Sequence, residues 1–162
     1  MSEASPPAAQ GRKFLVIVDQ TPECRVAQRY AARRAQHTGG TVTLLCVVGH
    51  ADIQQWAGVE RVMREEAYAE AQRLLQEAAQ YVREIAGGEP ELIVREGRAA
   101  DEIRALLKED GAISILVLAA GTSSEGPGPL VSEVARPGAG AYPIPVTVVP
   151  GSLSDEAIDA LA

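Results

Sequence analysis

Aromatic side chains are scarce in this sequence, at 4% of residues, although hydrophobic residues of all kinds make up 46%. A core must therefore be built from aliphatic side chains and alanine, a composition that suits central parallel strands covered by alanine-rich helices. Long apolar runs are also missing, because the longest are only strand-sized, so we expect no membrane-spanning segment. The length of 162 residues favours a single main domain.

The sequence also has no long continuous stretch of basic residues. The net charge is −7, and the arginines are spread along predicted helices among glutamates. We therefore expect neither nucleic acid nor an anionic membrane as a direct partner. The opening segment MSEASPPAAQGRKF lacks the cationic start and apolar centre of a signal peptide, which favours a cytoplasmic location.

Cysteine and histidine are few, with two of each. The two cysteines, Cys24 and Cys46, have no CxxC partner or adjacent histidine, so we expect reduced thiols without a catalytic role. His37 and His50 lie far apart, without the cysteines or carboxylates of a metal site. The segment GTSSEG lacks the spacing of a nucleophile elbow. These absences disfavour an enzyme.

What is present is an alternation of apolar runs and helical patterns. After a disordered lead-in over residues 1–11, the pattern predicts one domain over residues 12–151 and a short tail, 152–162, with helical character. Predicted strands cover 14–19, 41–48, 91–97, 112–120 and 144–151, and predicted helices cover 22–37, 60–86, 98–110 and 129–135. Such alternation predicts a three-layer α/β sandwich: a five-stranded, mostly parallel sheet with helices on both faces.

The start of the first helix and an irregular loop are marked by particular residues. Thr21 is the predicted N-cap of the first helix, with Pro22 at its first helical position. Residues 49–59 show no clear period, and they contain the single tryptophan, Trp56. We expect Trp56 to pack against the long helix; the alternative is that it covers a ligand crevice.

Candidate binding residues follow the strands. In sheets of this kind, ligands bind at the carboxyl ends of strands, beside the point where strand order reverses. Asp19, Val47, Gly97 and the loop 118–133 all lie at or just after predicted strand ends. We therefore expect them to meet in one crevice. The other reading of Asp19 is a carboxylate that caps the following helix.

Four segments in their order resemble the universal stress protein family over residues 12–150: FLVIVDQTPECRVAQRYAARRA, TVTLLCVV, VREGRAADEIRALLKEDGAISILVLAAG and YPIPVTVVPG. The resemblance implies a fold like that of the adenine nucleotide alpha hydrolases, a role in stress regulation, and homodimers that often form through the last strand. Many members bind ATP and others do not. The resemblance also places Asp19 on the adenine or ribose side of such a ligand.

The ATP-binding members carry the motif G-x2-G-x9-G-[ST] after strand four, and this chain departs from it. The first two motif glycines fall on Ala119 and Thr122, the third falls near Val131, one residue short of the family spacing, and the hydroxyl partner falls on Ser132. Three glycines of the loop are out of register: Gly121, Gly126 and Gly128.

The loop is also poorly suited to hold phosphates by its chemistry. A phosphate loop aims backbone N–H groups at the anion, and Pro127 and Pro129 have none. Glu125 and Glu133 add negative charge, and no lysine or arginine occurs between residues 108 and 136. A triphosphate would depend on Mg²⁺ or on cations from elsewhere in the fold.

Three hypotheses follow. The first is a homodimeric regulatory module that acts through contacts with an unknown protein partner and binds ATP weakly or not at all. The second is an ATP-binding regulator, with or without Mg²⁺, whose ligand contacts Asp19, Gly121, Thr122 and Ser132 in a crevice shared with Val47 and Ala119. The third is an enzyme, either a slow nucleotide hydrolase or a flavin-type electron carrier, for which no base or nucleophile is evident. The apolar run VTVV of the last strand favours edge pairing between two copies.

Overall fold

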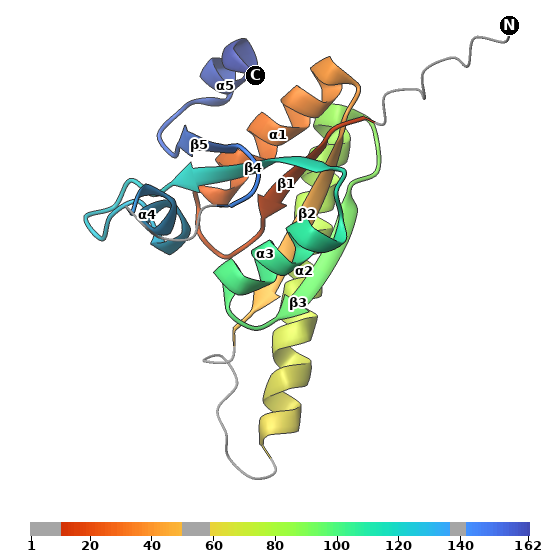
Figure 1. The fold of residues 1–162 in the computed structure, drawn as a ribbon, viewed down its shortest axis with the longest axis vertical. Helices are drawn as coiled ribbons and strands as arrows, with labels where there is room; N and C mark the ends of the chain where they lie inside the picture. The colour runs from red at the N-terminus through yellow and green to blue at the C-terminus, as the bar shows by residue number, and fades with distance from the viewer. Residues whose placement is uncertain (1–10, 50–58, 137–141) are drawn as a thin grey trace, which may run out of the picture.

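The computed structural model describes residues 11–49, 59–136 and 142–162. The lead-in 1–10, His50 and Trp56 lie outside these ranges. A five-stranded sheet with the order β3-β2-β1-β4-β5, every neighbouring pair parallel, carries helices on both faces (Figure 1). The predicted fold class is confirmed. The strands are β1 (Lys13–Ile17), β2 (Thr41–Val48), β3 (Glu91–Glu96), β4 (Ile113–Ala120) and β5 (Val146–Pro150), and the helices are α1 (Cys24–Thr38), α2 (Glu60–Ala86), α3 (Ala99–Glu109), α4 (Pro129–Ala135) and α5 (Asp155–Leu161).

The core has two halves, one on each face of the sheet. Helices α1 and α2 cover one face, where the small residues Ala27 and Ala31 of α1 let the helix approach the strands closely. Helix α3 covers the other face through Ile103 and Leu106, and α4 adds partly buried side chains there. Because β1 is covered on both sides, its apolar run is continuous rather than alternating.

The start of α1 differs from the prediction. The helix begins at Cys24 rather than Pro22, and no side chain caps its first turn. Thr21, the predicted N-cap, instead donates both its N–H, at 2.9 Å, and its hydroxyl to Asp19 Oδ1. This local turn keeps residues 19–21 out of the helix, which begins two residues later than predicted. Asp19 therefore follows β1, which ends at Ile17, rather than closing it.

The bounds of α2 and α4 agree with the predicted ranges 60–86 and 129–135. On the inward face of α2, Leu75 is fully buried and Leu74 is only partly buried. None of the described helices is both long and apolar enough to cross a membrane.

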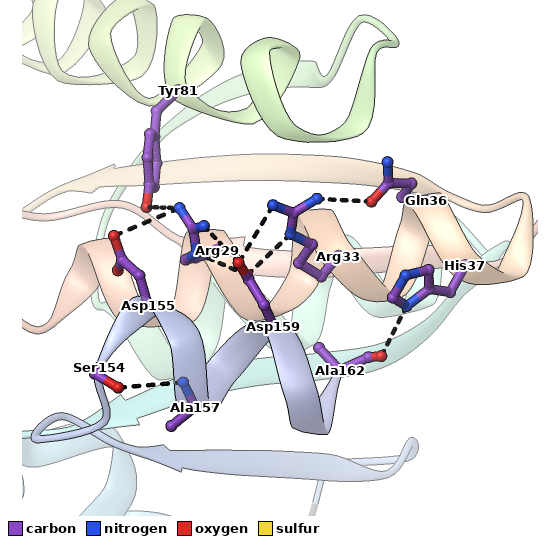
Figure 2. Close-up of polar contacts among 10 residues, drawn as sticks. All are labelled: Arg29, Arg33, Gln36, His37, Tyr81, Ser154, Asp155, Ala157, Asp159 and Ala162. Atoms are coloured by element: carbon purple, nitrogen blue, oxygen red, sulfur yellow. Dashed lines mark hydrogen bonds and ion pairs between the residues drawn. The ribbon is translucent and has the colours of Figure 1, made fainter.

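The last helix, α5, lies against α1, as Figure 2 shows. Ser154 caps it, because its hydroxyl accepts the Ala157 N–H at 3.1 Å. Ile158 is the only buried residue of the helix and is 0% exposed.

Polar contacts join α5 to α1 (Figure 2). Arg29 donates to Asp159 through Nε at 2.8 Å and Nη2 at 2.7 Å, and Arg33 Nε donates to the same carboxylate at 2.9 Å. These two arginines lower the pKa of Asp159 to about 2. His37 Nδ1 and the main-chain oxygen of Ala162 form a further hydrogen bond at 2.8 Å.

Candidate functional site

The reversal of strand order lies between β1 and β4. From β1 the chain winds outward through β2 to β3, then returns beside β1 as β4 and continues outward to β5. The connections that leave β1 and β4 therefore diverge, which opens a crevice at their carboxyl ends. Two cavities occur at this end of the sheet, and Asp19 lines both.

The larger cavity, of about 500 Å³, lies between the ends of β1 and β2 and helix α2. This volume falls within the usual range for small-molecule sites, roughly 300–1,000 Å³. Its walls combine aliphatic side chains with a few carboxylates and one amide: Val18, Asp19, Gln20, Cys46, Val47, Val48, Met63, Glu66, Ala67, Glu70, Ala71 and Leu74.

The smaller cavity, of about 90 Å³, lies at the reversal point itself, between β1 and β4. Ala119 and the segment from Pro127 to Val131 form one wall, and Asp19, Thr21 and Glu23 form the opposite one. This space is well below the roughly 300 Å³ at which small-molecule pockets begin. The space beside the degenerate motif is therefore too small for a nucleotide.

Some N–H groups in and just after the 121–128 loop are used within the chain. Gly121 donates to the Pro127 carbonyl at 2.9 Å, and Gly126 donates to Ser123 O at 3.1 Å. Ser132 donates to Gly128 O at 3.0 Å, as part of α4. A phosphate could take these donors only if the loop broke its own hydrogen bonds.

The charges beside the loop are also unfavourable to an anion. The Glu23 carboxylate lies against Gly121, since its Oε1 stands 3.0 Å from the point where a side chain on Gly121 would begin. Arg104 comes from α3 toward α4, but its Nη2 bonds Glu133 Oε1 at 2.8 Å, a contact that raises the pKa of Arg104. Arg104, a cation from elsewhere in the fold, is thus already bound to the Glu133 carboxylate.

The six predicted site residues are divided by this geometry. Asp19 and Val47 line the larger cavity together, and Asp19 and Ala119 line the smaller one. Gly121, Thr122 and Ser132 line neither of these two cavities. Gly97 also stands apart from both, and its N–H bonds the Val48 carbonyl at 2.9 Å.

Both cysteines are buried and free, and they lie near this site. Burial, aided by the negative charge of Asp19, raises the pKa of the Cys46 thiol to about 11. Burial likewise raises the pKa of Cys24, whose sulfur accepts from Gln28 Nε2 at 3.2 Å. Thiols of this kind are poor nucleophiles at neutral pH.

Sequence reasoning missed the α2 wall of the larger cavity. Neither Glu66 nor Glu70 is among the predicted site residues, yet both line the cavity. The signal was present, because they stand three residues after Met63 and Ala67 respectively, within the apolar stripe. Gln20 closes the same side, donating to Glu70 Oε1 at 3.2 Å.

Metal chemistry finds no support in the part of the chain that the structure describes. No group of three or more histidines, cysteines and carboxylates in it is placed to hold an ion. Of the two histidines, His37 bonds the α5 end, and His50 lies outside the described residues.

Comparison with known proteins gives one family and many similar structures. The model of the universal stress protein family matches residues 11–150. No curated protein sequence gives a significant match.

Three solved structures illustrate the likeness, each below 25% identity and therefore informative about fold alone. The universal stress protein UspA from Lactobacillus plantarum is 21% identical, with a TM-score of 0.71 over 88% of this chain and 99% of that one. A universal stress protein from Archaeoglobus fulgidus, in complex with dAMP, is 19% identical, with a TM-score of 0.62 over 86% and 98%. A family protein from Arabidopsis thaliana with AMP bound is 21% identical, with a TM-score of 0.62 over 90% and 94%.

Proposed function

The chain belongs to the universal stress protein family, and on that premise we propose that it is a homodimeric regulatory module. It acts through contacts with other proteins, and it binds ATP weakly or not at all. The observation that carries the second part is the hydrogen bond from Gly121 N–H to the Pro127 carbonyl. That bond folds the loop onto itself and takes up one of the N–H donors that a triphosphate would need.

The charges around the loop support the same proposal. Glu23 stands against Gly121, and Arg104 is bound to Glu133. Helix α4 has only seven residues, so it offers little dipole to an anion. A bound triphosphate would have to break a loop hydrogen bond and tolerate a neighbouring carboxylate.

The ATP part is tested by isothermal titration calorimetry with ATP and Mg²⁺. We expect no saturable heat at millimolar ligand concentrations. Micromolar binding that is lost in Asp19→Ala would overturn the proposal, because it would place the nucleotide in the crevice at the strand ends.

The dimer part rests on the edge of the sheet. β5 pairs with β4 alone among the described strands, so its outer edge has no partner within the chain. Val148 in this strand is 40% exposed, a large fraction for an aliphatic strand residue. An uncovered strand edge with exposed apolar side chains favours pairing with a second copy.

Light scattering after size-exclusion chromatography tests the dimer. We expect twice the chain mass for the wild type and a shift toward monomer for Val148→Lys. The matched control is Val62→Lys, a residue of α2 that is 46% exposed and far from β5 in the sequence. A monomeric wild type at every concentration would refute the dimer.

A second candidate function is adenine-nucleotide binding at the strand ends. Its support is the cavity of about 500 Å³ beside Asp19 and Val47, together with the structural relatives that contain AMP or dAMP. This candidate requires the ligand to place its phosphates away from the 121–128 loop, or to open that loop.

A further inference from the structure

We propose that helix α5 is a displaceable cover: it occupies a docking site on α1 that accepts an acidic helix of a partner protein. The inference rests on the proposed function, a module that acts through protein contacts, and it specifies the chemistry of one such contact. Three features support it: the place of α5 in the chain, the arginines that α5 covers, and the small number of contacts that hold it.

Helix α5 follows the part of the chain that the universal stress protein model matches. That match ends at residue 150, the last residue of β5, and α5 begins at Asp155. The five strands and helices α1 to α4 all lie within residues 11–150. The contact between α5 and α1 can therefore open while every strand pairing of the sheet stays intact.

The side of α1 that meets α5 carries a row of arginines. Arg25, Arg29 and Arg33 are spaced four residues apart, which places them along one side of the helix. Tyr81 of α2 stands beside this arginine row: the Arg25 guanidinium lies 4.0 Å from the centre of its ring, and Arg29 Nη1 donates to its hydroxyl at 3.2 Å. Arginine and tyrosine are the residue types enriched where proteins dock, so the row has the composition of an interface.

Helix α5 meets the arginine row with carboxylates. The segment 152–162 has no lysine or arginine and three acidic residues, Asp155, Glu156 and Asp159. Asp159 accepts hydrogen bonds from both Arg29 and Arg33, whose side chains are only 15% and 26% exposed with α5 in place (Figure 2). Asp155 Oδ2 lies 3.6 Å from Arg29 Nη1. These are the charge-assisted contacts by which arginines recognise a carboxylate.

The site also takes an apolar side chain. Ile158 is fully buried although it stands next to Asp159 on a short, otherwise partly exposed helix. A groove on a helical surface that takes one aliphatic side chain, flanked by arginines that take carboxylates, fits a helix rather than a phosphate group or a flat anionic surface. Helix α5 therefore shows what the site accepts: an aliphatic anchor followed by an acid.

Few contacts hold α5 in place. The helix has seven residues, too few to stay helical without docking, and Ile158 is its only buried residue. The ion pairs to Arg29 and Arg33 are partly exposed, so they contribute little and salt weakens them. A longer partner helix of the same chemistry makes the same contacts and adds others, so it can displace α5.

The test is fluorescence anisotropy with a labelled peptide SLSDEAIDALA, which has the sequence of residues 152–162 and stands in for the partner helix. The full-length wild type is compared with Asp159→Arg, which places a cation against Arg29 and Arg33 and should release α5. We expect at least about tenfold tighter binding to this variant, because the wild type must first give up its own helix, held at an effective concentration on the order of 1 mM. The matched control is Glu156→Arg, which reverses a charge at an exposed residue of α5 without an ion pair to another described residue, and which should bind like the wild type.

Variants of the peptide and of α1 locate the contact in the released protein. A peptide with Ile158→Ala or Asp159→Arg should bind at least about tenfold more weakly than the unchanged peptide, whereas one with Glu156→Arg should lose much less. In the protein, the added substitution Arg33→Gln should weaken binding of the unchanged peptide about threefold or more. Arg34→Gln, at a neighbouring arginine without an ion pair to another described residue, should leave it unchanged.

A second variant, Ile158→Ala, also releases α5 and keeps the test meaningful if Asp159→Arg disturbs folding. Hydrogen exchange identifies a usable variant: residues 158–162 should exchange faster than in the wild type, and the strands should exchange at the wild-type rate.

Each result either supports the inference or overturns it. Tighter binding to the released variants, dependent on Arg33 and on the isoleucine and aspartate of the peptide, supports it. Equal binding to wild type and released variants, or no saturable binding to any of them, overturns it. Light scattering that finds a monomer for Asp159→Arg and a dimer for Glu156→Arg would also overturn it, because α5 of a second copy would then fill the site. Failure of the proposed function is read separately, from a monomeric wild type or from micromolar ATP binding.

Discussion

Truncation of Ile158 to alanine should release the last helix from the domain. α5 has seven residues, too few for a stable isolated helix, so its structure depends on docking. Ile158 is its only buried residue and is 0% exposed. Full burial of an isoleucine stabilises by about 1.5–3 kcal/mol, and Ile→Ala substitutions in protein cores cost about 2–5 kcal/mol.

The docking of α5 sets an upper limit to the effect. Once α5 has separated from α1, weaker contacts at Ile158 no longer change the free energy of unfolding of the remaining domain. The surrounding ion pairs are partly exposed, and such pairs contribute little. We therefore expect Ile158→Ala to lower the free energy of unfolding by about 1–3 kcal/mol, below the upper end for a central core position.

Urea unfolding and hydrogen exchange together measure this effect. The control is Leu161→Ala, which removes a side chain of similar size from the same helix at a site that is 67% exposed. Its cost should stay within about 0.5 kcal/mol. In Ile158→Ala, the amides of residues 158–162 should exchange about tenfold to a hundredfold faster, since each 1.4 kcal/mol is about tenfold. Equal effects of the two variants, or unchanged exchange in α5, would refute the reasoning.

Three further predictions concern other parts of the fold. The pKa of Asp159 is lowered from 3.8 to about 2 in the folded state, so its carboxylate should stabilise the docking of α5 fully above pH 3.8. This stabilisation should be lost as the pH falls through about 2. In urea unfolding measured against pH, Asp159→Asn should remove this part of the pH dependence of the free energy of unfolding. Cys46, whose pKa is raised to about 11, should resist iodoacetamide at neutral pH until urea unfolds the chain, and rapid labelling of the native protein would contradict its burial. Gly97→Ala should cost about 1–3 kcal/mol in urea unfolding, because Gly97 has φ +149°, a backbone conformation that residues with a side chain rarely adopt. The matched control Gly88→Ala, at a glycine with open space around it, should cost much less.

Most of the fold could be predicted from the sequence because each element carries its own local signal. The continuous apolar runs of β1, β2 and β4 mark strands buried on both faces, and the alternation with helices implies parallel pairing. Helix α2 ends at Gly87, which takes the left-handed conformation that stops a helix. The errors lie at element ends, as at Thr21, where a side chain competes with the helix for a backbone N–H.

The site was less predictable because its chemistry depends on contacts between distant segments. The motif comparison indicated a degenerate phosphate loop, but only the fold shows that Gly121 donates to Pro127 and that Glu23 stands beside it. The composition of the loop also gave no indication that Arg104, from α3, would be engaged by Glu133. The cavity wall on α2 depends on how the helix is rotated about its axis over the sheet. The rotation could not be predicted from the sequence, because Glu66 interrupts the apolar stripe of the helix.

Weak or absent ATP binding depends most on the hydrogen bond within the 121–128 loop, and the amide resonance of Gly121 reports on that bond directly. Its N–H donates to Pro127 O at 2.9 Å, so nitrogen-15 NMR of the wild type during titration with ATP and Mg²⁺ tests whether a phosphate takes over this donor. We predict that the resonances of Gly121, Thr122 and Ser132 stay in place at millimolar ATP. Saturable shifts of all three at micromolar ATP would contradict the account.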